Sequence, residues 1–446
     1  MIKIMPTLPT RYRQVLAAIP SWYLVLVPSL LFLTNIGERA YQDVFFLVLL
    51  VYALVRGKAD WSPAVVTIWG TWIAYIAWST LTDSLGAGGF VYEPLQTADL
   101  ILLLPWLVGW AREDNFRRPL GIGFRVALGV AGIVALYQVL VLGWPRASGS
   151  ENALIFAALL SLYGIYVVYQ TFGRERGQPL LWMVLTLLPI TLSGSRAVIV
   201  ATVIIFLLMS IRFRRVLDYR ALVVGLIAVV LFSAALVIFA GKELSSRVSD
   251  AIASTPTSQD ELRVFAHDFI HMEFIRQSPS NDQTKPPVLE LKPQFATSIG
   301  NRLVYWRTGW TVFLSSPWLG VGSTQGMLAV GEALGMGRYF HDRHSHVHNT
   351  FLQHLVTGGI PKLVLLIAVL LLPIGVLARE RRTREWRLLV YVTVALTLFG
   401  LTNLVLELTV VTFIYTLILA HVLAGRTEKG RETEASALLK KGGSTG

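Results

Sequence analysis

The sequence contains no cysteine, and charged residues make up only 15% of its 446 residues. The missing cysteine excludes disulfides, thiolate catalysis and cysteine-based metal sites, and it leaves the cellular compartment undecided. The low charge is unusual, because soluble domains carry about 25% charged residues. With 54% hydrophobic residues, most of the protein's surface must face something other than water.

The long apolar runs lack both an internal repeat and a polar alternation of period two. The missing alternation argues against a β-barrel, because barrel strands alternate between lipid and lumen. A helix satisfies its own backbone in lipid and needs roughly 20 apolar residues to cross a bilayer. The sequence therefore predicts an all-α polytopic membrane protein with about twelve transmembrane helices. The expected spans are residues 20–35, 43–55, 63–81, 96–111, 121–143, 153–172, 179–194, 197–211, 220–241, 350–378, 386–402 and 404–425.

The net charge of +12 is explained by topology rather than by a nucleic-acid partner. Cytoplasmic loops of membrane proteins are rich in Lys and Arg. With the N-terminus inside, basic residues gather in the inside segments 1–19, 56–58, 112–118, 174–176, 212–220, 379–387 and 426–446. The short outside loops hold only Arg39, Arg146 and Arg196. Both termini are therefore expected in the cytoplasm, with an uncleaved first span.

The expected spans divide the chain into four parts. Residues 1–241 hold transmembrane helices 1–9, 242–347 form one large periplasmic loop, 348–425 hold helices 10–12, and 426–446 form a disordered cytoplasmic tail. Long loops without a function are uncommon. Within this loop we expect amphipathic helices at residues 244–252 and 260–276, and an apolar helix over 304–314 that ends at Ser315-Ser316-Pro317.

The first candidate site is the turn Ser193-Gly194-Ser195-Arg196 between two apolar spans. An arginine beside lipid is costly unless it reaches water or an anion. Two interpretations stay open: an interfacial arginine, and an anion site made of the guanidinium and the N–H groups of the turn.

The second candidate site is the segment Asn301–Arg307, followed by Pro317-Trp318-Leu319-Gly320-Val321-Gly322. Taken alone, Asn301–Arg307 fits a surface helix whose aromatic residues lie in the membrane interface. Tyr305, Trp306, Trp310 and Trp318 could equally line a prenyl or sugar groove. The glycine pair allows a tight turn or a close backbone approach.

The third candidate site is the histidine-rich segment from His341 to Asn349. Imidazoles are common metal ligands, but no cluster of carboxylates stands nearby in the sequence. A histidine could instead act as a general base, since its proton affinity suits activation of a hydroxyl near neutral pH. A polar loop without chemistry is the third interpretation.

Arginines and a histidine without a carboxylate cage suit the displacement of a diphosphate. Arginines neutralise a diphosphate by bidentate hydrogen bonds. A diphosphate is a good leaving group and needs no general acid, so only the attacking hydroxyl has to be deprotonated. The membrane would supply a lipid-linked substrate.

In this order, the motifs resemble those of the bacterial O-antigen ligase and polymerase superfamily. They are Ser-Gly-Ser-Arg at 193–196, Asn-Arg-x-x-x-Trp at 301–306, Pro-x-x-Gly-x-Gly at 317–322, and His-Asn-Thr followed by Gly-Gly-Ile at 348–360. The architecture is similar over most of the chain, and it looks most like the O-antigen ligase of lipopolysaccharide assembly. The fold of the family resembles the C-type membrane glycosyltransferases.

The resemblance implies a metal-independent, inverting glycosyltransferase without cofactors, in the bacterial inner membrane. The enzyme would transfer O-antigen glycan from undecaprenyl diphosphate to the lipid A–core oligosaccharide on the periplasmic face. The family's general base falls on His348, and its diphosphate-binding arginines fall on Arg196 and Arg302. Expected supporting residues are Ser195, Arg307, Arg343, His346 and Asn349. Lys362 stands where the family has Gly, Thr or Tyr, which weakens the register there.

Two other functions remain open. An O-antigen polymerase or a protein O-oligosaccharyltransferase belongs to the same superfamily, although polymerases often carry two large loops and only one is evident here. A transporter or flippase of a lipid-linked solute belongs to a different class. Transporters tend to have internal repeats and ionisable residues at mid-membrane, whereas Arg125 and Glu407 lie towards the ends of their spans.

Overall fold

The computed structural model describes sixteen ranges of the chain. They are residues 21–31, 43–44, 46–51, 58–91, 94, 99–144, 146–149, 152–172, 178–213, 259–278, 288–292, 295, 298–337, 346–378, 383–404 and 407–442. The expected span 220–241 and the expected amphipathic helix 244–252 lie outside these ranges.

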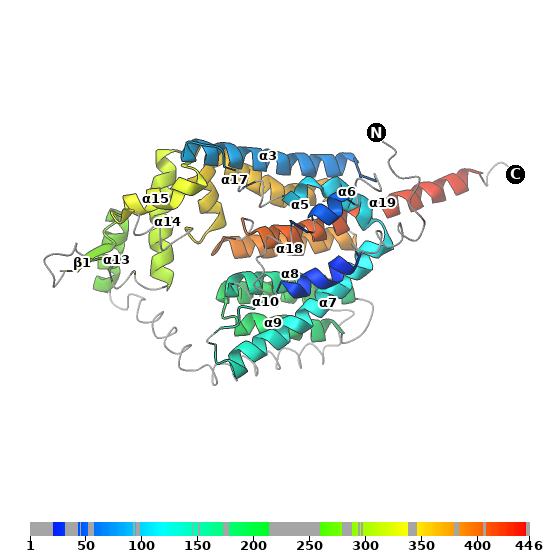
Figure 1. The fold of residues 1–446 in the computed structure, drawn as a ribbon, viewed down its shortest axis with the longest axis horizontal. Helices are drawn as coiled ribbons and strands as arrows, with labels where there is room; N and C mark the ends of the chain where they lie inside the picture. Colours follow the sequence, from blue (N-terminus) through cyan, green and yellow to red (C-terminus); the bar gives the residue numbers. More distant parts are fainter. Residues whose placement is uncertain are drawn as a thin grey trace.

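The described residues form a bundle of roughly aligned helices with a smaller group of elements at one end (Figure 1). The bundle helices are α3 (Pro63–Ala87), α5 (Asp99–Leu102), α6 (Leu104–Ala111), α7 (Asp114–Leu136, continued by a π-helical turn, Tyr137–Val141), α8 (Ala153–Thr171), α9 (Gln178–Leu192), α10 (Arg196–Arg212), α17 (Thr350–Val376), α18 (Arg384–Gly400) and α19 (Thr409–Gly442). The end group consists of α13 (Gln259–His271), β1 (Ile275–Ser278), β2 (Val288–Leu291), α14 (Ser298–Ser315) and α15 (Ser323–Ala333).

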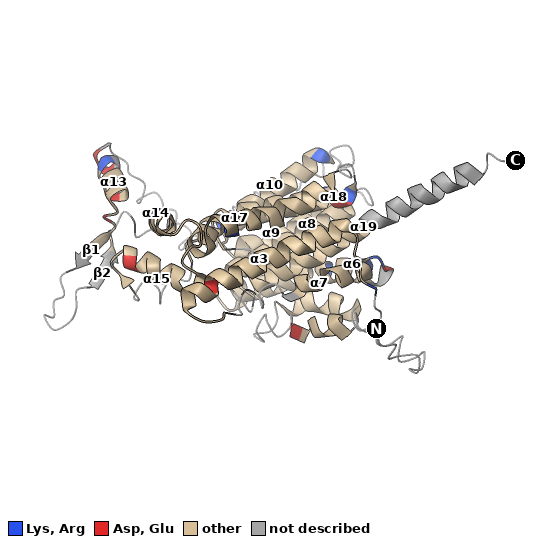
Figure 2. Ribbon diagram, turned by 90° about the horizontal axis from the view of Figure 1, so that it is seen from above, with Lys and Arg blue, Asp and Glu red and all other residues tan. Residues whose placement is uncertain are grey.

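Four helices among the described residues are long and apolar enough to cross a membrane: Pro63–Ala87, Phe116–Val141, Ala153–Thr171 and Thr350–Val376. Shorter apolar helices lie at Ser21–Leu30, Gln178–Leu192 and Thr409–Gly425. In Figure 2 the bundle helices are almost bare of Lys, Arg, Asp and Glu, which appear mainly at helix ends. These features confirm a helical multi-pass membrane protein, while the count of twelve spans and the sidedness stay predictions.

In the described part of the expected span 96–111, residues 99–111 form two short helices, α5 and α6. Leu103 separates the two helices, and Pro105 stands in the first turn of α6. Proline has no backbone N–H, so it is compatible with a first turn but not with a helix interior. The hydrophobic pattern of the sequence does not reveal this break in the helix.

The end group departs from the all-α expectation in one small element. Strands β1 and β2 pair antiparallel, with Ile275 opposite Leu291. The predicted amphipathic helix 260–276 therefore ends early, as α13, at His271. Met272 adopts a left-handed backbone with φ of 58°, which turns the chain out of the helix. By contrast, α14 ends at Ser315, as expected from the Ser-Ser-Pro stop.

The end group has its own apolar core, which includes Phe274, Phe295, Val304 and Val356. Because Val356 belongs to α17, this core continues into the bundle. Helix α15 is also tied to α3, since the backbone N–H of Ser323 donates to Asp83 Oδ1 at 2.6 Å. The loop elements are therefore fixed to the end of the bundle.

The expected disordered tail at 426–446 stays a prediction, and the structure describes a helical backbone over its first part. Helix α19 continues as a single helix from Thr409 to Gly442. The segment is charged, which predicts disorder, but it contains no proline and is rich in Glu, Ala, Leu and Lys. These residues have high helix propensity, so a helix already started in the bundle can continue through them.

Candidate functional site

One face of α14 carries Arg302, which is a predicted site residue, and Tyr305, which contacts His348. They are three positions apart, so they lie on the same side of the helix. Further along this face, Gly309 packs against Val347 and Leu352 at the start of α17. The absence of a side chain at Gly309 lets the two elements approach closely. Helix α14 therefore presents Arg302 and Tyr305 toward the segment that contains the histidines.

Tyr305 stacks on His348. The ring centroids are 5.9 Å apart and the planes differ by 18°. Tyr305 is 2% exposed, and this burial raises the pKa of its phenol to about 12. The tyrosine thus remains neutral over the physiological range and supports the imidazole by packing.

The backbone around His348 is held in an uncommon conformation. His348 has a φ of 55°, in the left-handed region that non-glycine residues rarely adopt. Its backbone N–H donates to His346 Nδ1 at 3.1 Å, and the two imidazole centroids are 4.2 Å apart. Such strain persists only where the surroundings over-determine it, and it is frequent at functional sites.

Asn349 fixes the junction between this segment and α17. It is the N-cap of α17, and its Oδ1 accepts from the backbone N–H of Leu352 at 3.0 Å. Its Nδ2 donates to the carbonyl of Leu401 at the end of α18. Gln353, one turn into α17, accepts the backbone N–H of Val347 at 3.0 Å. These bonds hold the backbone on both sides of His348.

The turn at 193–196 places Arg196 at the first position of α10. Gly194 has a φ of 65°, which a glycine adopts without strain. Ser195 is buried and its Oγ donates to the carbonyl of Ala153 at 3.1 Å. Arg146 braces the turn from outside, because its Nε donates to the carbonyl of Ser193 at 2.7 Å.

Arg196 and Arg302 lie close enough to influence each other. The pKa of Arg302 is lowered by partial burial and, next, by the positive charge of Arg196. Within the described residues, neither guanidinium makes a hydrogen bond or an ion pair. Two neighbouring cations without a structural task cost stability, and an anion between them would remove that cost.

The two glycine motifs pack against each other. Gly320 and Gly359 have φ values of 65° and 68°. A Cβ at Gly320 would lie 2.4 Å from the N of Gly358, and one at Gly359 would lie 2.4 Å from the carbonyl oxygen of Trp318. Backbone bonds, including Ile360 N–H to the Pro317 carbonyl at 2.8 Å, join the segments. This contact fixes α14 and α15 relative to α17.

Residues 181–367 match the model of a family described as O-antigen ligase. This part of the chain is therefore similar to the O-antigen ligase family. The matched segment contains both arginines, His348 and both glycine motifs. No curated protein matches the chain.

Within the matched segment 181–367, the expected supporting residues differ from one another in their contacts. Ser195, His346 and Asn349 take part in the turn and backbone contacts around Arg196 and His348. Arg307 donates to Thr311 Oγ1 at 3.0 Å and lies near the carbonyl of Ile270 at 3.5 Å, so it connects α14 to the end of α13. Arg343 lies outside the described residues.

The departure at Lys362 has a local explanation in the matched segment. Lys362 is 3% exposed and its Nζ donates to Thr357 Oγ1 at 3.1 Å. Its stem lies over Gly358, where no side chain competes for the space. The lysine is thus accommodated within its own helix, and the Gly-Gly contact is preserved.

Sequence reasoning missed three residues that support the site: Tyr305 as the stacking partner of His348, Gln353, and Arg146. The sequence predicts Tyr305 only as a residue of a groove or of the membrane interface. Arg146 carried a signal, because it is one of the few basic residues in the expected outside loops. Gln353 had none, since a lone polar residue in an apolar helix does not indicate its partner.

A cluster of potential metal ligands lies apart from the histidine segment, on α13 and in the turn that follows it. His267, Asp268 and Glu273 offer ligand atoms within 4.8 Å of one another. However, the ammonium of Lys292 lies 2.9 Å from Asp268 and 3.7 Å from Glu273. Lys292 already neutralises these carboxylates. We therefore interpret the cluster as an ion-pair network that holds α13 to the β1–β2 hairpin.

Proposed function

We propose that the protein is an O-antigen ligase that transfers a glycan from undecaprenyl diphosphate to the lipid A–core oligosaccharide. The observation that carries the proposal is the stacking of Tyr305 on His348. The same face of α14 bears Arg302, whose pKa is lowered by burial and by the positive charge of Arg196. The similarity of residues 181–367 to the O-antigen ligase family supports the same chemistry.

In this proposal the two arginines bind the diphosphate of the donor. Guanidinium groups bind phosphate oxygens bidentately and cannot lose their charge at working pH. When the bond between the anomeric carbon and the phosphate oxygen breaks, negative charge grows on the leaving diphosphate. The arginine pair stabilises this charge, so a metal ion is not required by the proposed step.

His348 acts as the general base in the same step. It takes the proton from a sugar hydroxyl of the acceptor, and the oxygen attacks the anomeric carbon from the face opposite the diphosphate. The configuration is therefore inverted, and undecaprenyl diphosphate leaves with the bonding electrons. Since Nδ1 of His348 is buried, we assign the base role to Nε2, with the ring held by Tyr305.

The proposed periplasmic position of the site follows from the expected topology. Arg302 lies on α14, His348 directly precedes α17, and Arg196 begins α10; α13, α14 and α15 lie together at one end of the bundle (Figure 1). Arg117, Arg384 and Arg212 stand at the start of α7, the start of α18 and the end of α10, which are the helix ends expected on the cytoplasmic side. A lipid-linked donor could thus place its prenyl chain in the membrane and its glycan outside.

The test is a reconstituted transfer assay with purified protein and an undecaprenyl-diphosphate-linked glycan. Two acceptors are offered separately: lipid A–core, and a second donor molecule. We expect product on lipid A–core. Chain growth on the donor would instead identify an O-antigen polymerase, and no transfer to either acceptor, with transport of the donor across a bilayer, would identify a flippase.

A further inference from the structure

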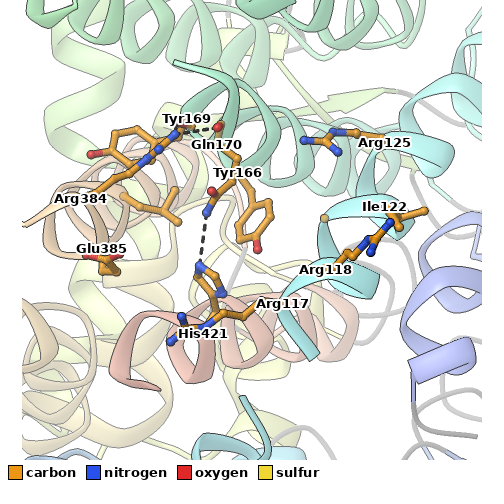
Figure 3. A pocket seen from close by; sticks show the side chains of 12 residues that line it. Arg117, Arg118, Ile122, Arg125, Tyr166, Tyr169, Gln170, Arg384, Glu385 and His421 are labelled. Carbon is orange, nitrogen blue, oxygen red and sulfur yellow. Dashed lines mark hydrogen bonds between the residues drawn. The ribbon is translucent and has the colours of Figure 1, made fainter. Parts of the chain in front are cut away.

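A cavity of about 750 Å³ lies where α7 and α18 begin and α8 ends. Its walls come from α7, α8, α18 and α19 (Figure 3). The proposed transfer reaction uses none of its residues. Its volume lies in the range of ordinary ligand sites, which is about 300–1,000 Å³.

The cavity is strongly basic. Arg117, Arg118, Arg125 and Arg384 line it, and Glu385 is the one acidic residue in its lining. Arginine is favoured where a phosphate must be bound by planar, paired hydrogen bonds. The charge and the residue type together point to an anionic phosphate group as the ligand.

Two of these arginines have structural tasks and two do not. Arg384 donates to the carbonyls of Tyr169 and Gln170 at 2.6 and 2.7 Å, which caps the end of α8. Arg117 donates to the carbonyl of Ala111 at 3.1 Å. Arg118 and Arg125, in contrast, make no hydrogen bond or ion pair to any described residue. They are the two guanidinium groups available for a ligand.

The same face of α7 continues as an apolar stripe. Ile122, which lines the cavity between Arg118 and Arg125, is 37% exposed. Val126 and Ile133 follow at helical spacing and are 44% and 70% exposed. An exposed apolar stripe on a helix long enough to cross a membrane faces acyl chains. A soluble phosphate would use the arginines but not this stripe.

We propose that the cavity binds the phosphate headgroup of an anionic membrane phospholipid, whose acyl chains lie along the α7 stripe. Arg118 and Arg125 bind the phosphate from α7. In Figure 3 they lie across the cavity from Tyr169 and Arg384. Basic pockets between transmembrane helices are known to bind such headgroups on the cytoplasmic side. The site is separate from the proposed donor site and does not depend on its function.

The test is native mass spectrometry of the full-length protein titrated with phosphatidylglycerol, phosphatidylcholine or inorganic phosphate. The double variant Arg118→Gln, Arg125→Gln is expected to bind phosphatidylglycerol roughly thirtyfold more weakly than the wild type. The matched control is Arg212→Gln, an exposed arginine at the end of α10 that does not line the cavity. The control should bind as the wild type does.

The double variant Arg118→Lys, Arg125→Lys keeps both positive charges and should retain most of the phosphatidylglycerol binding. This variant distinguishes an effect of lost charge from an effect of misfolding. Equal weakening in the Arg212→Gln control would overturn the proposal. So would equal binding of phosphatidylcholine, or displacement of phosphatidylglycerol by inorganic phosphate at equimolar concentration, which would indicate a soluble anion.

Discussion

At the scale of single residues, the structure joins three side chains that are far apart in the sequence. These side chains are Arg196, Arg302 and His348. The positive charge of Arg196 lowers the pKa of Arg302. Arg302 shares a face of α14 with Tyr305, and Tyr305 stacks on His348. Each contact is modest. Their value lies in connecting the proposed diphosphate-binding arginines to the proposed base, His348.

Replacing His348 by alanine is expected to lower the rate of glycan transfer by at least about a hundredfold, because general bases contribute factors of that size. The measurement is initial rate in the reconstituted assay, with donor binding followed in parallel. Binding should persist, since the arginines are unchanged. The control is His267→Ala, a histidine that is 61% exposed on α13. Wild-type rates in the His348 variant would refute the base assignment.

Replacing Arg302 by glutamine separates its functional charge from its structural cost. The folded protein lowers the pKa of Arg302; the charged form is therefore less favourable in the folded than in the unfolded chain at every pH below that pKa. The neutral variant should keep or slightly raise the melting temperature of the ligand-free protein, by at most about 2 °C since the site is partly solvated. It should also lose the stabilisation that added pyrophosphate gives the wild type.

Arg307→Gln is the matched control on the same helix. Arg307 bonds to Thr311 and approaches the end of α13, so its loss should lower the melting temperature while the effect of pyrophosphate remains. Thermal unfolding in detergent measures both variants. Retained pyrophosphate stabilisation in Arg302→Gln would contradict the anion assignment.

At the scale of elements, the loop is attached to the bundle through glycines. The turn 317–322 packs backbone to backbone on Gly358 and Gly359 of α17. No other residue type allows both the positive φ and the close approach. The orientation of α14, and with it of Arg302, depends on this contact.

Substituting alanine at Gly320 or at Gly359 should destabilise the protein by about 2 kcal/mol or more, because the new Cβ meets backbone atoms and the left-handed conformation becomes strained. Chemical unfolding of the end group, or loss of transfer activity, measures the effect. Gly70→Ala is the control: Gly70 lies in α3 and its Cβ would meet nothing within 4 Å. Similar losses in the control would point to general helix sensitivity instead.

At the scale of the whole molecule, the protein has two basic sites. Arg302 of the first site lies on α14, and the cavity with Arg118 and Arg125 lies where α7 and α18 begin and α8 ends. The expected topology places the first site in the periplasm and the second in the cytoplasm. This assignment is open to a direct test.

Because the chain contains no cysteine, the topology can be measured by introducing one cysteine at a time and labelling it. Asp260→Cys, on α13 with a side chain 93% exposed, should react with a membrane-impermeant maleimide in intact cells whose outer membrane has been permeabilised. Lys58→Cys, with a side chain 68% exposed at the other end, should react only after lysis. The reverse pattern would invert the proposed orientation and place the transfer site in the cytoplasm.

The sequence by itself indicated a helical multi-pass membrane protein, several of its apolar helices, and the candidate residues of the site. Hydrophobic runs and helix stops such as Ser315-Ser316-Pro317 are local properties, and helices depend largely on local sequence. Local rules also account for the errors, because the break at Leu103 and the hairpin after α13 each depend on context that periodicity does not contain.

Only the tertiary structure decided that the charge of Arg196 reaches Arg302 and lowers its pKa, and that Tyr305 stacks on His348. These contacts join elements separated by long stretches of chain, and their geometry follows from how helices pack through glycine contacts. A sequence lists which charges and rings exist and on which side of the membrane they are expected. The packing of α14 against α17 sets which of them meet.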